Sequence, residues 1–227
     1  ELDFESSNMR AKVAIEKNIK VSIAHYSRGQ PIFNKVKQML KDKIIGDVRF
    51  AKLEFYKKPL PPEALKIPKV AWRVNPAIAG GGLFHDIAPH QIDLMYWLFG
   101  EIEKASGYSN NQSKIYDADD IVSGNILFKS GVVFNGLWCF NVAEENVKDY
   151  CEIQGSEGKI CFPVFEHKKI EIIKNGKTEN ILFEPLEHVQ QPLIQKVVDY
   201  FLEKGPNPSS AEDGAKVMRL LDQFTKK

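Results

Sequence analysis

The chain has 227 residues with 43% hydrophobic side chains, and its 31 lysines and arginines nearly balance its 30 aspartates and glutamates. A chain of this length and apolar content buries a large core, while a net charge of +1 with dispersed lysines provides no basic surface for nucleic acid. No apolar run approaches the roughly 18 residues of a membrane-spanning helix, so neither a nucleic-acid partner nor a membrane is expected.

The first 28 residues predict one helix followed by one strand. Residues 5–18 have helical character, and residues 19–26 have the composition of a strand. The turn after this strand, Ser27-Arg28-Gly29-Gln30, lacks the G-x-G-x-x-G spacing that binds a dinucleotide at such a turn. The start of the chain therefore carries no nucleotide-binding fingerprint.

A helix and a strand follow, and then a long proline-rich loop. Pro31 opens a helix over residues 31–44 that stops at Gly46, and residues 48–56 alternate as a strand does. Residues 57–76 hold five of the twelve prolines. A loop of that length in a compact domain is usually functional or mobile, and this one leads into a run of three glycines.

The most informative stretch joins Gly80-Gly81-Gly82 to a helix predicted over residues 84–99. Glycines lack a Cβ, so a ligand can approach the backbone closely, and the triplet is predicted to be the floor of a pocket. Asp86 falls near the first turn, where a carboxylate accepts free N–H groups, and Pro89 also suits a first turn. Asp86 and His90 are four residues apart, which predicts a hydrogen-bonded general-base pair on one helix face.

Both residues also have a purely structural interpretation, which the spacing leaves open. Asp86 can act only as a helix cap. His90 shares its face with Ile87, Leu94 and Trp97, which is the spacing of a core stripe.

From residue 101 onward the pattern changes to short strands, with Asn175-Gly176 as the strongest hairpin signal. Consecutive hairpins predict an α+β fold with a large, predominantly antiparallel sheet packed against helices on one face. Two helices close the chain, over residues 186–203 and 211–225, with Gly205-Pro206-Asn207-Pro208 between them. The predicted strands cover residues 102–109, 121–128, 132–141, 148–154, 159–163, 169–174 and 177–183.

The three cysteines, Cys139, Cys151 and Cys161, lie in apolar, strand-like surroundings without paired spacing. Metal sites need paired ligand spacings that are missing here. We therefore expect no metal, and we interpret the cysteines as buried free thiols of a protein in a reducing compartment.

Several motifs stand in the order that is typical of one enzyme family. The chain resembles the glucose-fructose oxidoreductase and inositol dehydrogenase (Gfo/Idh/MocA) family in Trp72-Arg73, Gly80-Gly81-Gly82, Asp86, His90 and Asp93. Residues 19–56 are similar to the family's crossing between its two domains, and residues 188–224 to its two closing helices.

The resemblance implies a division into two parts. Family members pair an N-terminal Rossmann domain with a C-terminal substrate domain, so residues 1–28 are expected to be a remnant of the Rossmann domain and residues 29–227 the substrate-binding and oligomerisation domain. A catalytic lysine follows a glutamate in the family, whereas here Glu1 is followed by Leu2 and Asp3. The chain is therefore expected to be a fragment that does not turn over by itself.

The implied activity is hydride transfer between a sugar or polyol hydroxyl and NAD or NADP, in a cytoplasmic homodimer or homotetramer that pairs through the sheet face. His90 would take the hydroxyl proton, and Asp86 would orient His90 or hold a neighbouring hydroxyl. His85 is the candidate cofactor contact and, with His25, a candidate proton relay. The candidate substrate-binding residues are Trp72, Arg73, Gly81, Gly82, Tyr26 and Arg28.

Two alternatives remain at this point: an NAD-dependent glycosidase of the same family, and a non-catalytic carbohydrate-binding or oligomerisation module. Trp138 can stack on a sugar ring, although its apolar neighbours favour a core position. His188, at the start of the penultimate helix, is expected to be a capping or surface residue.

Overall fold

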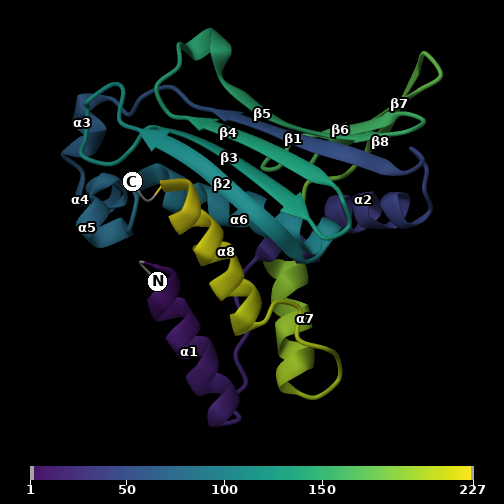
Figure 1. Cartoon of the computed structure of the whole chain (residues 1–227), viewed down its shortest axis with the longest axis horizontal. Coiled ribbons are helices and arrows are strands. Elements are labelled where there is room, and N and C mark those ends of the chain that lie inside the picture. Colours follow the sequence, from purple (N-terminus) through teal and green to yellow (C-terminus); the bar gives the residue numbers. More distant parts are fainter. Residues whose placement is uncertain (1–2, 226–227) are drawn as a thin grey trace.

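A single sheet of eight strands organises the molecule, and helices lie against one of its faces in the computed structural model, which describes residues 3–225 (Figure 1). The strands run in the order β2-β3-β4-β1-β5-β6-β7-β8. They are β1 (Val48–Tyr56), β2 (Ile102–Asn110), β3 (Ile121–Phe128), β4 (Val133–Cys139), β5 (Lys148–Gly155), β6 (Lys159–Phe162), β7 (Lys169–Lys174) and β8 (Lys177–Leu182).

Helices precede, interrupt and follow the strands. The α-helices are α1 (Phe4–Glu16), α2 (Pro31–Lys41), α3 (Pro62–Leu65), α4 (Pro68–Ala71), α5 (Pro76–Ala79), α6 (Gly82–Phe99), α7 (Gln191–Phe201) and α8 (Ala211–Thr225). Short 3-10 turns are η1 (Tyr26–Gly29), η2 (Trp72–Val74) and η3 (Glu144–Asn146). The predicted α+β class is confirmed.

The sheet is antiparallel except where β1 pairs in parallel with β4. That parallel pair arises because β1 lies between β4 and β5, although it precedes β2 in the chain. The hairpin pattern predicted antiparallel neighbours, but it contained nothing about the place of this first strand. Pairing between segments far apart in the chain is decided by the tertiary fold.

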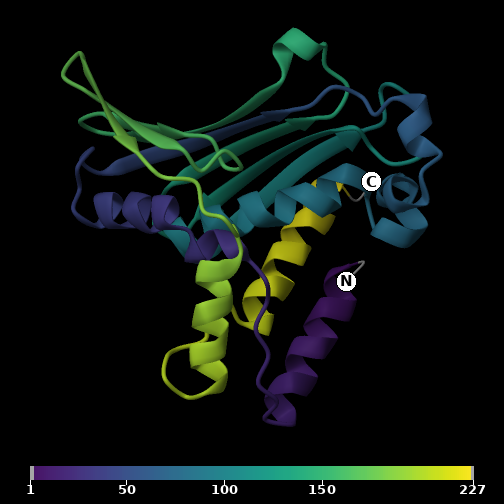
Figure 2. The same ribbon diagram turned by 180° about the vertical axis from the view of Figure 1, so that it is seen from behind.

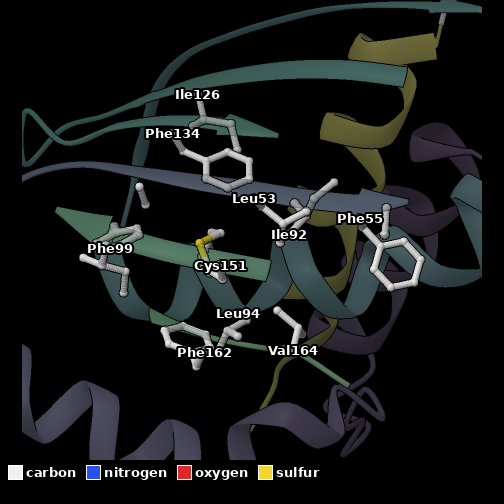
Figure 3. Packing of buried hydrophobic residues seen from close by; sticks show 14 of the residues in the cluster. Leu53, Phe55, Ile92, Leu94, Phe99, Ile126, Phe134, Cys151, Phe162 and Val164 are labelled. Carbon is white, nitrogen blue, oxygen red and sulfur yellow. The ribbon is translucent and has the colours of Figure 1, made fainter. Parts of the chain in front are cut away.

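The core lies between the sheet and the helices. Alternate strand residues point toward α6 and α2, and the large side chains of Leu53, Phe134 and Trp138 are fully buried there. Figure 3 shows Ile92 and Leu94 of α6 in the same cluster as side chains from the strands. The cluster fixes α6, and therefore the residues that follow the glycine triplet, against the middle of the sheet.

The opposite face of the sheet is not covered by the described helices (Figures 1 and 2). Polar side chains occupy part of it, with Glu54 bound to Lys148 at 2.7 Å and Glu152 bound to Lys159 at 2.7 Å.

All three cysteines are free and buried, as predicted. Among residues 3–225 no helix is both long and apolar enough to cross a membrane.

The strand predicted over residues 19–26 is wrong. Residues 19–25 have no regular secondary structure and no pairing strand, and Tyr26–Gly29 forms η1 instead. A strand exists only when a neighbour takes its backbone hydrogen bonds, and here Ile23 N donates to Ser209 O of a loop. The segment has strand composition but no strand beside it in the described chain.

The loop predicted over residues 57–76 is also more ordered than expected. Prolines start α3, α4 and α5 at their first turns, where a proline lacks only an N–H that would be free anyway.

The penultimate helix begins later than predicted, at Gln191, so His188 lies before it and is well exposed. Residues 1 and 2, on which the comparison with the family lysine depends, lie outside the described residues.

Candidate functional site

The glycine triplet forms the turn into α6. Gly80 and Gly82 have φ angles of 81° and 73°, a region that favours glycine. A Cβ on Gly82 would collide with the side chain of Ala118, and a Cβ on Gly81 would collide with Nδ1 of His85. The space expected above these glycines is therefore filled in part by the protein's own side chains.

Asp86 pairs with an arginine and not with His90. Because α6 starts at Gly82, Asp86 and Pro89 lie beyond the first turn, and the predicted helix-cap role is wrong. The carboxylate of Asp86 lies 3.1 Å from Nε of Arg73, and Arg73 also donates to Lys69 O at 2.9 Å. Since Arg73 takes the carboxylate, the hydrogen bond predicted between Asp86 and His90 does not form.

Trp72 and Arg73 stand together at the end of the segment that contains α3 and α4. The Arg73 guanidinium lies over the indole of Trp72, 5.0 Å from the ring centroid, and Trp72 is 39% exposed. The pair of Arg73 and Asp86 joins this segment to α6, so the two predicted substrate-binding residues lie beside the helix that carries His90.

His90 lies half-buried on α6 with its ring against Tyr26, the two ring centroids being 4.9 Å apart. Its Nδ1 is buried and has no hydrogen-bond partner among the described residues. Burial and the nearby His25 lower the pKa of His90, while Asp93 and Asp86 act in the opposite direction with smaller effect. The imidazole is therefore neutral at pH 7, which is the state in which it can accept a proton.

Tyr26 is the first residue of η1, and its ring also approaches His167 at 6.1 Å between centroids. Burial, helped by Asp149, raises the pKa of Tyr26, so its hydroxyl stays protonated. The fold thus brings Tyr26, His90 and His167 together from three segments. Sequence reasoning missed His167, because a lone histidine in the turn between β6 and β7 carries no spacing signal.

Arg28 belongs to a buried network rather than to an open surface. Its guanidinium binds both carboxylate oxygens of Asp93 at 2.6–3.2 Å and binds Asp213 at 2.8 Å. Nδ1 of His25 lies 2.8 Å from the same Asp93 carboxylate and 3.1 Å from Ser209 Oγ. The network fastens η1, with Tyr26, to α6, with His90.

The charges within this network support each other. Burial alone would lower the pKa of Arg28, but Asp93 and Asp213 outweigh it and raise the pKa. Burial alone would raise the pKa of Asp93, but His25 and Arg28 outweigh it and lower the pKa. Both groups are therefore charged at neutral pH, and the donors of Arg28 are directed at the protein itself.

Two further candidates, His85 and Trp138, have other side chains as partners. His85 packs over Gly81 and contacts Phe84 at 5.6 Å between ring centroids, and burial lowers its pKa. Trp138 is fully buried and donates from Nε1 to Gln91 Oε1 at 2.6 Å. The prediction that Trp138 can stack on a sugar is therefore wrong, because its indole lies in the core between the sheet and the helices.

The fold and these motifs define a protein class. The chain belongs to the Gfo/Idh/MocA family of oxidoreductases: residues 33–161 match the GFO/IDH/MocA C-terminal domain. The chain is also similar to "Oxidoreductase P35" of Formosa agariphila, with 42% identity over 223 residues that make up 98% of this chain and 68% of that protein.

Solved structures with low sequence identity share the fold. Aldose-aldose oxidoreductase from Caulobacter crescentus, complexed with glycerol, superposes with a TM-score of 0.81 at 18% identity, covering 97% of this chain and 65% of that one. A levoglucosan dehydrogenase in complex with NADH and levoglucosan gives 0.82 at 22% identity, covering 98% and 68%. The chain thus spans about two thirds of the length of these relatives.

Among residues 3–225 no group of histidines, cysteines and carboxylates could hold a metal ion. The glycine triplet and η1 both lack the turn that cradles a dinucleotide phosphate. His90 therefore offers a proton acceptor for a reaction at a nicotinamide, and neither of these two turns offers a cradle for the nucleotide end of the cofactor.

Proposed function

We propose that this chain is the substrate-binding part of an NAD(P)-dependent oxidoreductase that acts on the CH–OH group of a sugar or polyol. The observation that carries the proposal is the state of His90: a neutral, half-buried imidazole with a buried Nδ1 that has no partner, at the histidine position of the family motif. A buried polar atom without a partner is costly in a folded protein, and groups whose pKa is shifted by burial concentrate at functional sites.

His90 acts as the general base in this proposal. Oxidation of an alcohol removes a hydride from carbon and a proton from oxygen, and the proton passes to the imidazole as negative charge develops on that oxygen. A bound nicotinamide supplies the acceptor for the hydride. Tyr26 orients His90 through the contact between their rings, and the Arg28–Asp93 pair holds the two elements in register.

The remaining residues of the site have supporting roles. Arg73 holds Asp86 and lies over Trp72, which is proposed to contact the substrate. Gly81 and Gly82 allow the chain to turn tightly into α6. His85 is proposed to face the cofactor. Residues 29–227 are proposed to be the substrate-binding and oligomerisation domain, and residues 1–28 a remnant of the Rossmann domain that binds the nucleotide. The buried free thiols favour a reducing compartment such as the cytoplasm.

The test joins this chain to the part of the Formosa oxidoreductase that it does not match, since 42% identity over the shared part favours a working interface. The chimera is expected to reduce NAD or NADP with a sugar or polyol. His90→Gln should lower kcat/KM by roughly 100-fold or more. His188→Gln, a change at an exposed histidine, is the matched control and should change nothing.

Two outcomes of this experiment, and one of a separate titration, argue against the proposal. Turnover by His90→Gln at the rate of the unchanged chimera would remove the base assignment. Release of a free sugar from a glycoside without net reduction of the cofactor would favour the NAD-dependent glycosidase. Micromolar binding of NADH to the 227-residue chain alone, followed by nicotinamide fluorescence, would show a nucleotide site within it.

A further inference from the structure

The turn between β6 and β7 brings a further aromatic side chain, His167, to the wall of the candidate site. Its ring lies edge-on to Tyr26, with centroids 6.1 Å apart, and edge-on to the buried Phe33, with centroids 5.5 Å apart. Tyr26 contacts His90 in turn. Tyr26 thus contacts two imidazoles that come from distant parts of the chain.

This turn is held in place by the protein itself. Asp149 on β5 accepts hydrogen bonds from Val164 N at 2.9 Å and from Phe165 N at 2.7 Å. Beyond His167, Phe183 N donates to Lys168 O at 2.8 Å, which closes the other side of the turn. His167 is therefore positioned before any ligand arrives, which lowers the cost of binding.

His167 and His90, like His85 and four other described side chains, each have a buried polar atom without a hydrogen-bond partner. Nε2 of His167 and Nδ1 of His90 are both buried, and neither has a hydrogen-bond partner among residues 3–225. Burial also lowers the pKa of His167, with Val164 and Asp149 opposing the shift. A neutral imidazole carries one N–H and one lone pair, and a hydroxyl group can donate and accept, so hydroxyl groups satisfy either tautomer.

The charges around these rings favour a ligand without a carboxylate. The two arginines that the sequence placed at the substrate are both held by the protein: Arg28 by Asp93 and Asp213, and Arg73 by Asp86. Asp86 adds a partly exposed carboxylate to the same helix as His90. A sugar acid would meet arginines that are already paired, whereas a neutral sugar meets aromatic faces with polar edges.

We infer that His167 is a second substrate-binding residue and that the site takes a neutral polyhydroxylated compound in preference to a sugar acid. The inference rests on the proposed function, because it places the ligand at His90. One hydroxyl of the ligand meets His90 and loses its proton there. A neighbouring hydroxyl meets Nε2 of His167 and fixes the orientation of the ligand.

The first test uses the 227-residue chain itself, with its five histidines labelled for NMR. Glucose and xylitol should shift the ring signals of His90 and His167, while the signals of exposed His188 stay fixed. Glucuronate should bind at least several-fold more weakly than glucose. Absence of any shift at His167 up to molar concentrations of polyol, or tighter binding of glucuronate, would overturn the inference.

The second test separates binding from folding. His167→Phe keeps the ring that packs on Phe33 and Tyr26 but removes the buried nitrogen without a partner. The midpoint of thermal unfolding should stay equal or rise, while glucose binds roughly tenfold more weakly. His167→Gln should restore part of the affinity, because its amide can replace Nε2. A lower melting temperature with unchanged glucose affinity would mean that His167 is purely structural.

The chimera described above distinguishes this inference from the proposed function. Turnover with a KM for polyol that His167→Phe leaves unchanged would refute the role of His167 and leave the oxidoreductase proposal standing. Polyol binding at His167 in a chimera that transfers no hydride would refute the oxidoreductase proposal and leave a sugar-binding site that contains His167.

Discussion

Replacement of Asp93 by asparagine tests the network that holds the site together. Asp93 has no exposed side-chain surface, and Arg28, its main partner, has a side chain that is only 7% exposed. Removing one member of a buried ion pair usually costs roughly 3–5 kcal/mol, because the other charge stays buried without compensation. Arg28 keeps Asp213, which is 22% exposed, so we expect a loss near the lower end, about 3 kcal/mol.

Urea unfolding followed by circular dichroism measures this loss as a fall in the midpoint at constant slope. Asp47→Asn is the matched control, because Asp47 also pairs with a cation but the pair with Lys43 is largely exposed, at 60% and 71%. That control should leave stability unchanged within error. The double variant Arg28→Met with Asp93→Leu should recover much of the loss, because both charges are then removed together.

The Arg28–Asp93 pair also makes the stability of the folded chain depend on pH. Because the folded state lowers the pKa of Asp93 below its ordinary value, the carboxylate contributes stability that is complete above the unfolded pKa, near 4. That contribution disappears as the pH falls through the folded pKa. The difference in stability between the native chain and Asp93→Asn should therefore shrink below about pH 4. If Asp93→Asn loses no more stability than Asp47→Asn at pH 7, the network does not hold the site.

Three further changes test other parts of the structure. Gly81→Ala should destabilise the chain by roughly 1–3 kcal/mol through the collision with His85, and adding His85→Ala should recover most of that loss in the same urea assay; no recovery would exclude the collision as the cause. Arg73→Gln should cost under ~1 kcal/mol, because Arg73 and Asp86 are both 37% exposed, and a larger loss on thermal unfolding would show that the pair anchors the whole segment before α5. We also propose that the uncovered sheet face joins subunits, as expected for the family. Leu137 lies beside Glu54 in the register of β1 and β4, so Leu137→Glu should lower the mass measured by light scattering. An unchanged mass would place any interface elsewhere.

The site divides into residues that the sequence reveals and residues that it cannot reveal. The glycine triplet, Asp86, His90 and Asp93 are readable because they lie in one short stretch with fixed spacing. The partner of Asp86 was wrongly expected to be His90, since four-residue spacing puts both on one face but takes no account of Arg73. No sequence pattern predicts a role for His167, because only the pairing of β6 with β7 places its turn beside Tyr26.

The sequence by itself determined the elements whose signals are local. Apolar periodicity and turn residues predicted α2, α6, α8 and the seven strands β2 to β8, because such patterns act over a few residues. The tertiary structure decided what depends on distant partners. It inserted β1 beside β4, left residues 19–25 without a strand to pair with, and buried Arg28 against Asp93. Hydrogen bonds and ion pairs between remote segments form only when the fold brings both partners together, and no local pattern records that pairing.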